Sequence, residues 1–366
     1  MMQNLIRFSS NSGVVNHVIY TINLQQQSSF VKPTMPGAAS EQVFYYNARD
    51  NFYHTCRQLA KLIPHEKAIL VAHDWLELGM ASNLGLQYKV MQVLHGNYPY
   101  YYELAIKNSK AVDAFVCIAG SIAQKLAQLL PQRQNDIHYL RFPVAGSKCT
   151  RNTKQGFNVV FIGRCTKEKG YHLLPGIAVA LAAKGIQANW HIVGELMEAE
   201  NRLYQWPDNT AVHFYGNISN EKVRALLCEM DVVVLPSIAE GMPVSIIEAM
   251  KAGVVPIVND LPGGIQELVL QEQTGIKVPG NDPAGFAEAL IKIALNAVER
   301  QYMAANTMQR AKEMFDPINN TVAIENLYSE LHDCLPGKKP VVKVYGSRLD
   351  KPLMPNLITQ LIRRSK

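Results

Sequence analysis

The chain has 366 residues, of which 48% are hydrophobic, and this length suits two domains rather than one compact core. Its net charge of +6 is compatible with an anionic substrate, an anionic membrane surface or nucleic acid. Because no run of Lys and Arg and no nucleic-acid-binding motif supports the third class, we expect no nucleic-acid partner.

The six cysteines are scattered and form no C-x-x-C pair, which favours reduced, buried thiols in a cytoplasmic protein. The N-terminal residues lack the cationic flank and the apolar stretch of a signal peptide. No apolar run reaches the length that a membrane-spanning helix requires. We therefore expect a cytoplasmic location, with peripheral contact at the inner face of the membrane left open.

The first half of the chain alternates between strand-like and helix-like segments. β-Branched side chains favour a strand over residues 14–26. Strands are also expected at 4–9, 68–72, 89–94, 114–118 and 137–142, helices at 47–62 and 121–130, and loops at 11–13 and 28–40. Ser121 is the expected N-cap of the second of these helices. Such alternation predicts a parallel, doubly wound sheet.

Two strand ends in this half carry histidines. His95 follows one predicted strand, and His73 with Asp74 follows the strand before it. A histidine at a strand end is more often structural than catalytic, so both interpretations stay open. The tyrosine-rich segment 98–102 also has two interpretations, which are packing of a helix start and stacking on a sugar or a membrane interface.

A polar and basic segment, residues 143–156, is the predicted linker and hinge before a second alternating unit. In that unit strands are expected at 158–162, 189–193, 212–215, 231–235 and 254–258, and helices after 169, at 219–229, from 262 and at 317–335. Gly163 ends the first of these strands and lets the chain turn sharply. Arg164 and Lys169 bracket the loop that follows. They either direct two cations at one anion or remain solvated.

Residues 236–253 have the pattern of a strand end, a loop and a helix. Glu240 lies in the loop, and Glu248 lies about two turns further along the chain. Pro243 is at the expected first helical position, and Ser245 and Glu248 have the spacing of a capping box. In a parallel sheet such a loop lies where ligands bind. The helix start suits a phosphate, whereas carboxylates suit the hydroxyl groups of a sugar or a ribose.

Glu240 and Glu248, in the segment EGMPVSIIEAM, resemble the E-x7-E motif of the retaining GT-B glycosyltransferases of family GT4. Gly163-Arg164 followed by Lys169-Gly170 resembles the family's GR…KG pair, which binds the donor diphosphate. The resemblance implies an α/β fold of two Rossmann-like domains facing across a cleft, with a C-terminal helix that crosses back to the N-terminal domain. The implied domains are 1–145 on the acceptor side, 146–316 for the nucleotide-sugar donor, and 317–366 as a crossover helix with a basic amphipathic tail.

The resemblance also implies the site residues. The implied catalytic residues are His95, Arg164, Lys169 and Glu240. The implied donor-binding residues are Gly163, Arg164, Lys169, Gly241, Met242, Pro243 and Glu248. Arg164 and Lys169 would stabilise the leaving diphosphate, while Glu240 would hold donor-sugar hydroxyls and Glu248 the ribose. Gly13 would form an acceptor-facing loop before a helix over 14–26. Because the chain has no Asp-x-Asp pair, we expect no metal and no cofactor besides the donor.

The function that the resemblance implies is a metal-independent, retaining hexosyltransferase. It would move a sugar from a nucleotide diphosphate sugar, a UDP-sugar rather than a GDP-sugar, to a glycan or a lipid-linked glycan. Such an enzyme would serve cell-surface polysaccharide or lipopolysaccharide synthesis. Two alternatives stay open, namely a non-catalytic nucleotide-sugar-binding protein and a sugar-nucleotide epimerase of the same fold.

The tail has an amphipathic pattern. One helical face carries Leu353, Leu357, Ile358, Leu361 and Ile362, with Arg363, Arg364 and Lys366 behind it. This helix either lies on an anionic membrane surface or docks on the protein's own N-terminal domain.

Overall fold

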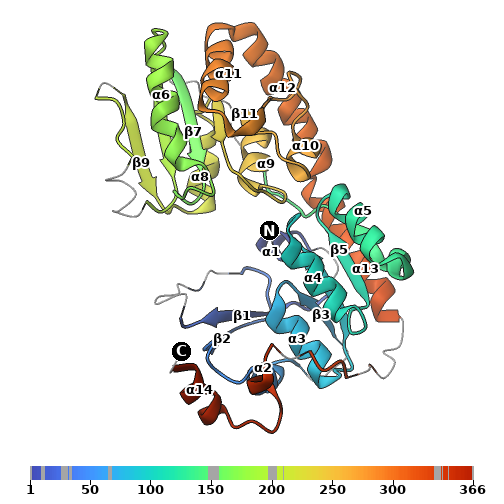
Figure 1. Cartoon of the computed structure of the whole chain (residues 1–366). Helices are drawn as coiled ribbons and strands as arrows, with labels where there is room; N and C mark the ends of the chain where they lie inside the picture. Colours follow the sequence, from blue (N-terminus) through green and yellow to red (C-terminus); the bar gives the residue numbers. More distant parts are fainter. Residues whose placement is uncertain are drawn as a thin grey trace. The chain divides into compact units, whose positions relative to one another are not determined.

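The computed structural model describes residues 2–9, 13–25, 32, 35–64, 68–146, 156–196, 204–208, 210–333, 339, 341–344 and 346–364. The chain divides into two compact units, which Figure 1 shows coloured along the sequence. Unit 1 comprises Met1–Phe142 with Ile318–Lys366, and unit 2 comprises Pro143–Pro317. The last part of the chain therefore returns to the first unit, as the predicted crossover helix requires.

Unit 2 contains one parallel sheet with the strand order β12-β11-β10-β7-β8-β9. Its strands are β7 (Phe157–Ile162), β8 (Ala188–Val193), β9 (Val212–Gly216), β10 (Val232–Leu235), β11 (Val255–Asn259) and β12 (Ile276–Val278). Every residue of β10 and β11 is buried. Their nearly continuous apolar sequences are typical of parallel strands that are covered on both faces.

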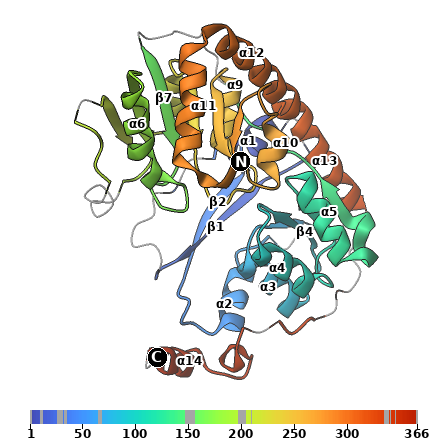
Figure 2. The same ribbon diagram turned by 45° about the horizontal axis from the view of Figure 1, so that its top comes forward.

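The helices of unit 2 follow its strands. They are α6 (Leu174–Ala183), α8 (Asn220–Leu227), α9 (Val244–Lys251), α10 (Gly264–Leu268), α11 (Pro283–Leu295) and α12 (Ala297–Met314), with short 3-10 turns η2 (Tyr171–Leu173) and η3 (Pro279–Asn281). Helix α9 packs against α12, and α6 packs against α11, an arrangement that can be followed in Figure 2. This alternation of strand and helix gives the doubly wound α/β architecture predicted for this half.

Unit 1 contains two parallel sheets. The larger has the order β3-β4-β5-β6, and the smaller pairs β1 with β2. The strands are β1 (His17–Asn23), β2 (Ser40–Tyr46), β3 (Ile69–Ala72), β4 (Lys89–Leu94), β5 (Ala114–Cys117) and β6 (Ile137–Tyr139). Strands β3 and β4 lie side by side, and the last residue of β3, Ala72, is in register with Gln92, two residues before β4 ends. The order of the larger sheet is sequential, unlike the two-directional order of unit 2.

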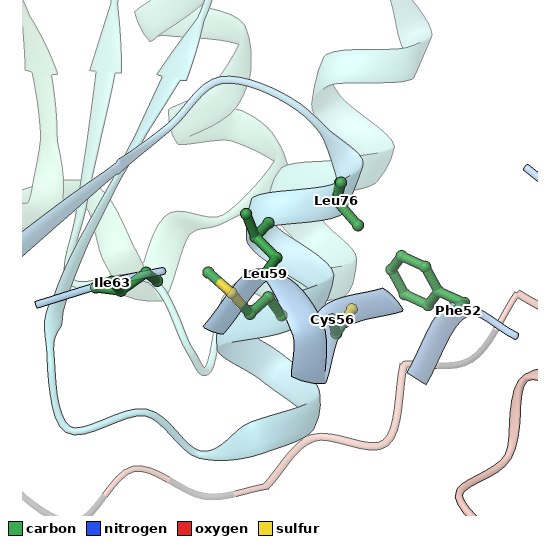
Figure 3. Packing of buried hydrophobic residues seen from close by; sticks show 6 residues of the cluster. Phe52, Cys56, Leu59, Ile63 and Leu76 are labelled. Carbon is green, nitrogen blue, oxygen red and sulfur yellow. The ribbon is translucent and has the colours of Figure 1, made fainter. Parts of the chain in front are cut away.

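The helices of unit 1 are α1 (Met2–Phe8), α2 (Phe52–Ala60), α3 (Trp75–Leu84), α4 (Pro99–Asn108), α5 (Gly120–Leu129), α13 (Pro317–Asp333) and α14 (Asn356–Arg364), with η1 (Pro131–Asp136) and η4 (Arg348–Asp350). A hydrophobic cluster lies where α2 packs on α3. Figure 3 shows its members, which are Phe52, Cys56, Leu59, Ile63, Leu76 and Met80. This cluster fixes the positions of α2 and α3, and therefore also those of their N-cap residues, Asn51 and Asp74.

Three predictions for the N-terminal half are wrong in detail. Residues 4–9 are mostly helical rather than a strand, because a short apolar run fits either element and Leu5 and Ile6 are buried in the helical form. The helix expected at 47–62 begins only at Phe52, since Asn51 caps it by accepting from two backbone N–H groups. Helix α5 begins at Gly120, so Ser121 is inside it and is not its cap.

Residues 14–26 contain the strand β1, as their β-branched side chains indicate, and not the helix that the family resemblance implies. The sequence analysis missed β2 altogether. Of the predicted turn at 11–13 only Gly13 is described. Residues 28–31, 33 and 34 of the predicted 28–40 loop and residues 147–155 of the predicted hinge lie outside the described residues, as do residues 334–335 of the last predicted helix.

Among the described cysteines, Cys56 and Cys117 are free and buried, as expected, and Cys165 is buried as well. Cys228 is disulfide-bonded, which differs from the expectation of reduced thiols. Within the part of the chain that the structure describes, no helix combines the length and the apolar character needed to cross a bilayer.

Candidate functional site

The sheet of unit 2 changes its winding direction between β7 and β10. The chain proceeds from β7 to β8 and β9 on one side, then returns to place β10, β11 and β12 on the other. In open α/β sheets, ligands bind at the carboxyl ends of the strands at this switch point. The two loops that leave β7 and β10 there are residues 163–170 and 236–243, which contain nearly all the predicted donor-site residues.

Backbone contacts hold these two loops together. The Glu168 carbonyl accepts hydrogen bonds from the Ile238 N–H at 2.9 Å and from the Ser237 hydroxyl at 3.1 Å. Gly170 has a φ of +75°, and a Cβ atom there would lie 2.0 Å from the Pro236 carbonyl oxygen. Only glycine therefore permits this approach. The sequence Lys169-Gly170 thus has a structural reason, because Gly170 lets the loop that carries Lys169 pack against the loop that follows β10.

Lys169 and Glu240 form an ion pair between the two loops. Their Nζ and Oε1 atoms are 2.7 Å apart, and the side chains are only 20% and 8% exposed. An ammonium group has three donors, so Lys169 can keep Glu240 and still donate to other oxygen atoms. The pair places a cation and a hydrogen-bond acceptor next to each other at the switch point, which suits a ligand with both phosphate and hydroxyl groups.

Arg164 is held much more loosely than Lys169. Its guanidinium group lies 3.3 Å from the Glu168 carboxylate, and its side chain is 68% exposed. An exposed pair of this kind contributes roughly 0–1 kcal/mol, so little free energy is needed to release Arg164 to another anion. Gly163 precedes it and donates its N–H to the Val193 carbonyl at 2.9 Å. The loop therefore leaves β7 anchored to the end of the neighbouring strand β8, and the arginine side chain stays accessible.

Glu248 lies inside α9, buried beside Arg224 of α8 at an N–O distance of 3.6 Å. Burial raises the pKa of this carboxyl group, and Arg224 opposes the rise without cancelling it. The predicted capping box is wrong, because Pro243 is the N-cap residue, α9 has no side-chain cap hydrogen bond, and Ser245 lies inside the helix. An acid that burial disfavours in its charged form gains from hydroxyl donors, which a ribose would supply.

Gly241, Met242 and Pro243 connect Glu240 to α9. Met242 is buried, and the Gly241 carbonyl lies so close to Gly264 that a Cβ atom there would be 2.0 Å away. This contact fixes the backbone just before the helix start. The loop is pinned further by Asn259, whose amide donates to the Ser237 carbonyl at 3.0 Å. The helix therefore begins from an ordered segment that the neighbouring loops hold in place.

His95 lies in unit 1, where it pairs with His73. The Nδ1 atom of His73 and the Nε2 atom of His95 are 2.8 Å apart, and His95 also stacks on Phe142. Burial lowers the pKa of His95 to about 3 and that of His73 to about 4. Both imidazoles are thus uncharged at neutral pH. One of them donates to the other, so His95 has only its Nδ1 position left to offer a ligand.

Asp74 and the tyrosine-rich segment surround this histidine pair. Asp74 caps α3 in a reciprocal capping box with Glu77, and it accepts a hydrogen bond from the Tyr100 hydroxyl. Tyr102 is buried and donates to the Asn97 side chain at 2.8 Å. Packing of a helix start therefore accounts for Tyr102, while Tyr100 is 43% exposed.

Sequence reasoning missed Arg224, Ser237 and Asn259. Arg224 is in mid-helix, 24 residues before Glu248, and no local pattern connects the two. Ser237 and Asn259 follow or end buried strands, so their place at strand ends is the one signal that could have identified them. Among the described residues, no group of three or more His, Cys, Asp or Glu side chains is arranged to hold a metal ion.

Comparison with known proteins agrees with this geometry. Residues 149–310 match the family Glycosyl transferases group 1. Glycogen synthase of Mycobacterium tuberculosis is 25% identical over 278 residues, which are 68% of this chain and 65% of that protein. WcaL of Escherichia coli K12, a candidate colanic acid biosynthesis glycosyltransferase, is 30% identical over 189 residues, 48% of this chain and 45% of WcaL. The aligned part thus spans less than two thirds of either relative.

A solved structure extends the likeness to the whole fold. Alr3699/HepE of Anabaena, in complex with UDP-glucose, superposes with a TM-score of 0.68 at 14% identity, over 86% of this chain and 99% of that chain. The chain therefore has two α/β units of the GT-B type. Residues 149–310, which match the Glycosyl transferases group 1 family, make up most of unit 2.

Proposed function

We propose that this protein is a retaining glycosyltransferase that moves a sugar from a nucleotide diphosphate sugar to an acceptor hydroxyl. The observation that carries the proposal is the Lys169–Glu240 ion pair at the switch point of unit 2, within residues that match a glycosyltransferase family. The pair combines a cation for the diphosphate with a carboxylate for sugar hydroxyls. His95 is the residue of unit 1 that we assign to the same reaction.

The residues have separate tasks in this mechanism. The bond between the sugar anomeric carbon and the diphosphate oxygen breaks while the acceptor oxygen bonds to the same face of that carbon. The acceptor proton passes to the leaving diphosphate. Lys169 and Arg164 stabilise the negative charge that develops there, which is usually the largest catalytic contribution. Glu240 orients the donor sugar, and Glu248 accepts hydrogen bonds from the ribose.

His95 acts in this scheme as a neutral hydrogen-bond donor. Its lowered pKa makes an imidazolium at the leaving phosphate unfavourable at neutral pH. The pair with His73 fixes the ring, so its remaining nitrogen can bind a donor-sugar hydroxyl. Lys169 and Arg164 therefore supply the positive charge of the site, and His95 supplies orientation.

We further propose a UDP-sugar as the donor and a glycan or a lipid-linked glycan as the acceptor. The support is the UDP-glucose bound by the structural relative HepE and the polysaccharide-related names of the sequence relatives. Catalysis without a metal, a role in cell-surface polysaccharide or lipopolysaccharide synthesis and a cytoplasmic location belong to the same proposal.

Calorimetric titration with UDP, GDP and ADP, with and without EDTA, tests the donor site. We expect UDP to bind in the presence of EDTA and its affinity to fall strongly in Glu248→Ala. A screen of UDP-sugars for transfer or slow hydrolysis then tests catalysis. Failure of all three nucleotides to bind would remove the donor site. UDP binding without any turnover would favour a non-catalytic nucleotide-sugar-binding protein.

A further inference from the structure

Helix α14 is attached to unit 1 through its polar side. The Asn356 side chain accepts from the Asn51 N–H at 2.6 Å, and the Gln360 amide donates to the Asp50 carboxylate at 2.6 Å. Arg363 donates to the Asp50 carbonyl at 2.6 Å. Each of these partners lies just before or at the N-cap of α2. The docking that the sequence analysis considered is therefore present, but the apolar stripe does not make it.

Two further groups hold the segment that leads into α14. Asn51 is fully buried, and its amide donates to the carbonyls of Leu349, Lys351 and Met354. Asp350 is also buried and accepts two hydrogen bonds from Arg363 at 2.9 Å. These contacts set the rotation of α14 about its own axis, because both its start and its last turn are fixed.

The apolar side chains of this segment face away from the protein. Their exposed fractions are 96% for Leu353, 68% for Leu357, 44% for Ile358, 56% for Leu361 and 39% for Ile362. An amphipathic helix of a globular domain normally buries its apolar stripe against the core. In α14 the polar side contacts the protein and the apolar stripe faces water. Figure 1 shows α14 at the margin of unit 1.

The charge around this apolar stripe is almost entirely positive. Residues 336–366 contain one acidic residue, Asp350, and its carboxylate is paired with Arg363. The basic residues of this stretch are Lys338, Lys339, Lys343, Arg348, Lys351, Arg363, Arg364 and Lys366. Of the described ones, Lys343, Arg348, Lys351 and Arg364 are exposed. An apolar stripe with basic residues beside it is the pattern of helices that lie in the plane of an anionic bilayer surface.

We propose that α14 is a membrane-docking helix that binds anionic phospholipid. Its leucines and isoleucines enter the boundary between headgroups and acyl chains, while Arg348, Lys351 and Arg364 bind the headgroup phosphates. A second copy of the chain is a poorer occupant, since two such surfaces face to face would oppose like charges. The inference does not depend on the glycosyltransferase assignment, because it uses neither the donor site nor turnover.

Flotation with vesicles tests the proposal on the full chain. We expect the protein to float with phosphatidylglycerol-containing vesicles and not with pure phosphatidylcholine vesicles, and less well in 0.5 M salt because salt screens the charges. Leu357→Ser with Leu361→Ser should lower the partition coefficient at least tenfold. Arg348→Gln with Lys351→Gln and Arg364→Gln should remove the preference for anionic lipid.

The matched control is Leu295→Ser with Val298→Ser in unit 2, two apolar side chains that are 74% and 78% exposed. This variant should bind vesicles like the wild type. Thermal unfolding followed by circular dichroism shows that each variant is folded, and it keeps the two proposals separate because it does not use the donor site.

Two results would overturn the proposal. One is absence of binding to anionic vesicles, or equal binding by the Leu357→Ser/Leu361→Ser variant. The other is a lipid-free dimer in sedimentation velocity that becomes a monomer in that variant, which would assign the apolar stripe to a second copy of the chain.

Discussion

The two units hold their candidate site residues in opposite electrostatic states. In unit 2, Lys169 pairs with Glu240 between two loops, and Arg224 of α8 lies beside Glu248 of α9, so these four charges are buried or half-buried and compensated. In unit 1, His73 and His95 share a hydrogen bond, and burial keeps both uncharged at neutral pH. Unit 2 can therefore bind and stabilise an anion, whereas the histidine pair can only orient a neutral group.

This difference follows from the position of each group in its sheet. The unit 2 loops leave two adjacent strands at the switch point, where backbone contacts keep them together and opposite charges can compensate each other. The histidines follow two adjacent strands within a sequentially ordered sheet, with no carboxylate bonded to either ring in the described residues. Both units therefore use the ends of parallel strands, but among the described site residues the compensating charges are those of unit 2.

Lys169 provides the largest test of this comparison. Replacing it with Met removes the charge that we assign to the leaving diphosphate, and we expect kcat for UDP-sugar turnover to fall by about 10²–10³-fold. The matched control is Lys167→Met, because Lys167 lies on the same loop and is exposed. It should keep kcat within threefold of the wild type.

Loss of folding would complicate that result, since Glu240 would be left buried without its partner. Thermal unfolding of each variant therefore accompanies the kinetics, and UDP affinity reports on the integrity of the site. If the Lys169→Met variant is folded and turns over as fast as the Lys167→Met variant, the assignment of Lys169 to the leaving group is wrong.

Lys251 is a charged residue of unit 2 that stabilises the fold and has no assigned role in ligand binding. It is buried and donates to the carbonyls of Val144 and Phe315, which lie near the two ends of unit 2. Lys251→Met should lower the free energy of unfolding by about 1–3 kcal/mol, since buried carbonyls lose their donor. Lys184→Met, an exposed lysine of the same unit, is the control.

The pH dependence of this effect has a definite sign. Burial lowers the pKa of Lys251 to about 8, whereas unfolding restores the ordinary value of 10.5. Between pH 8 and 10.5 the unfolded chain therefore holds more protons, and the contribution of Lys251 to stability rises with pH. The difference in free energy of unfolding between the wild type and Lys251→Met, measured by urea denaturation, should increase from pH 7 to 9.5. A difference that decreases would contradict the assigned pKa shift.

The comparison also explains which parts of the site could be predicted from sequence. Arg164, Lys169 and Glu240 lie in the loops that follow two apolar strands, and each is next to or near a glycine or proline that marks a loop. Strand ends of this kind are local features, so their positions in unit 2 followed from pattern alone. Arg224 could not be predicted, because its contact with Glu248 depends on how α8 packs beside α9.

Orientation was the main thing that the sequence did not determine. Both His73 and His95 were expected at strand ends, but their contact depends on the register of β3 with β4. The amphipathic stripe was predicted correctly for Leu357, Ile358, Leu361 and Ile362, whereas Leu353 lies before α14. The outward direction of the stripe depends on Asn51 and Asp50, about 300 residues earlier. Most of helix α1 was predicted as a strand, and strand β2 was not predicted at all. Short segments of this kind have no repeated pattern that distinguishes a helix from a strand.

Replacing Glu248 should have a smaller effect, on UDP affinity and its pH dependence, which tests the role of a buried charge in unit 2. Glu248→Gln keeps the size of the side chain but removes its charge, and we expect UDP affinity to fall by about tenfold, as for one charge-assisted hydrogen bond. Because burial raises the pKa of Glu248, it is protonated at a higher pH than an ordinary glutamate. Wild-type affinity should therefore decline as the pH is lowered from 8 to 5, and the variant should show a flatter profile.

The control for this experiment is Glu221→Gln, an exposed carboxylate in the first turn of α8. Its affinity for UDP should follow the wild type at every pH. A wild-type profile that stays flat to pH 5, or a variant that declines in parallel, would show that the ionised Glu248 carboxylate does not bind the nucleotide.

The histidine pair offers the smallest change, because we expect no titration at all. With pKa values of about 3 and 4, His95 and His73 should keep their NMR ring signals unchanged between pH 8 and pH 5.5. The signals are assigned with His95→Gln and His73→Gln, and the exposed His332 is an internal reference in the same spectra. Loss of His73 should disturb the ring signals of His95, since the shared hydrogen bond fixes its tautomer. A midpoint near pH 6.5 for either ring would place a cation in unit 1 and abolish the electrostatic difference between the two units.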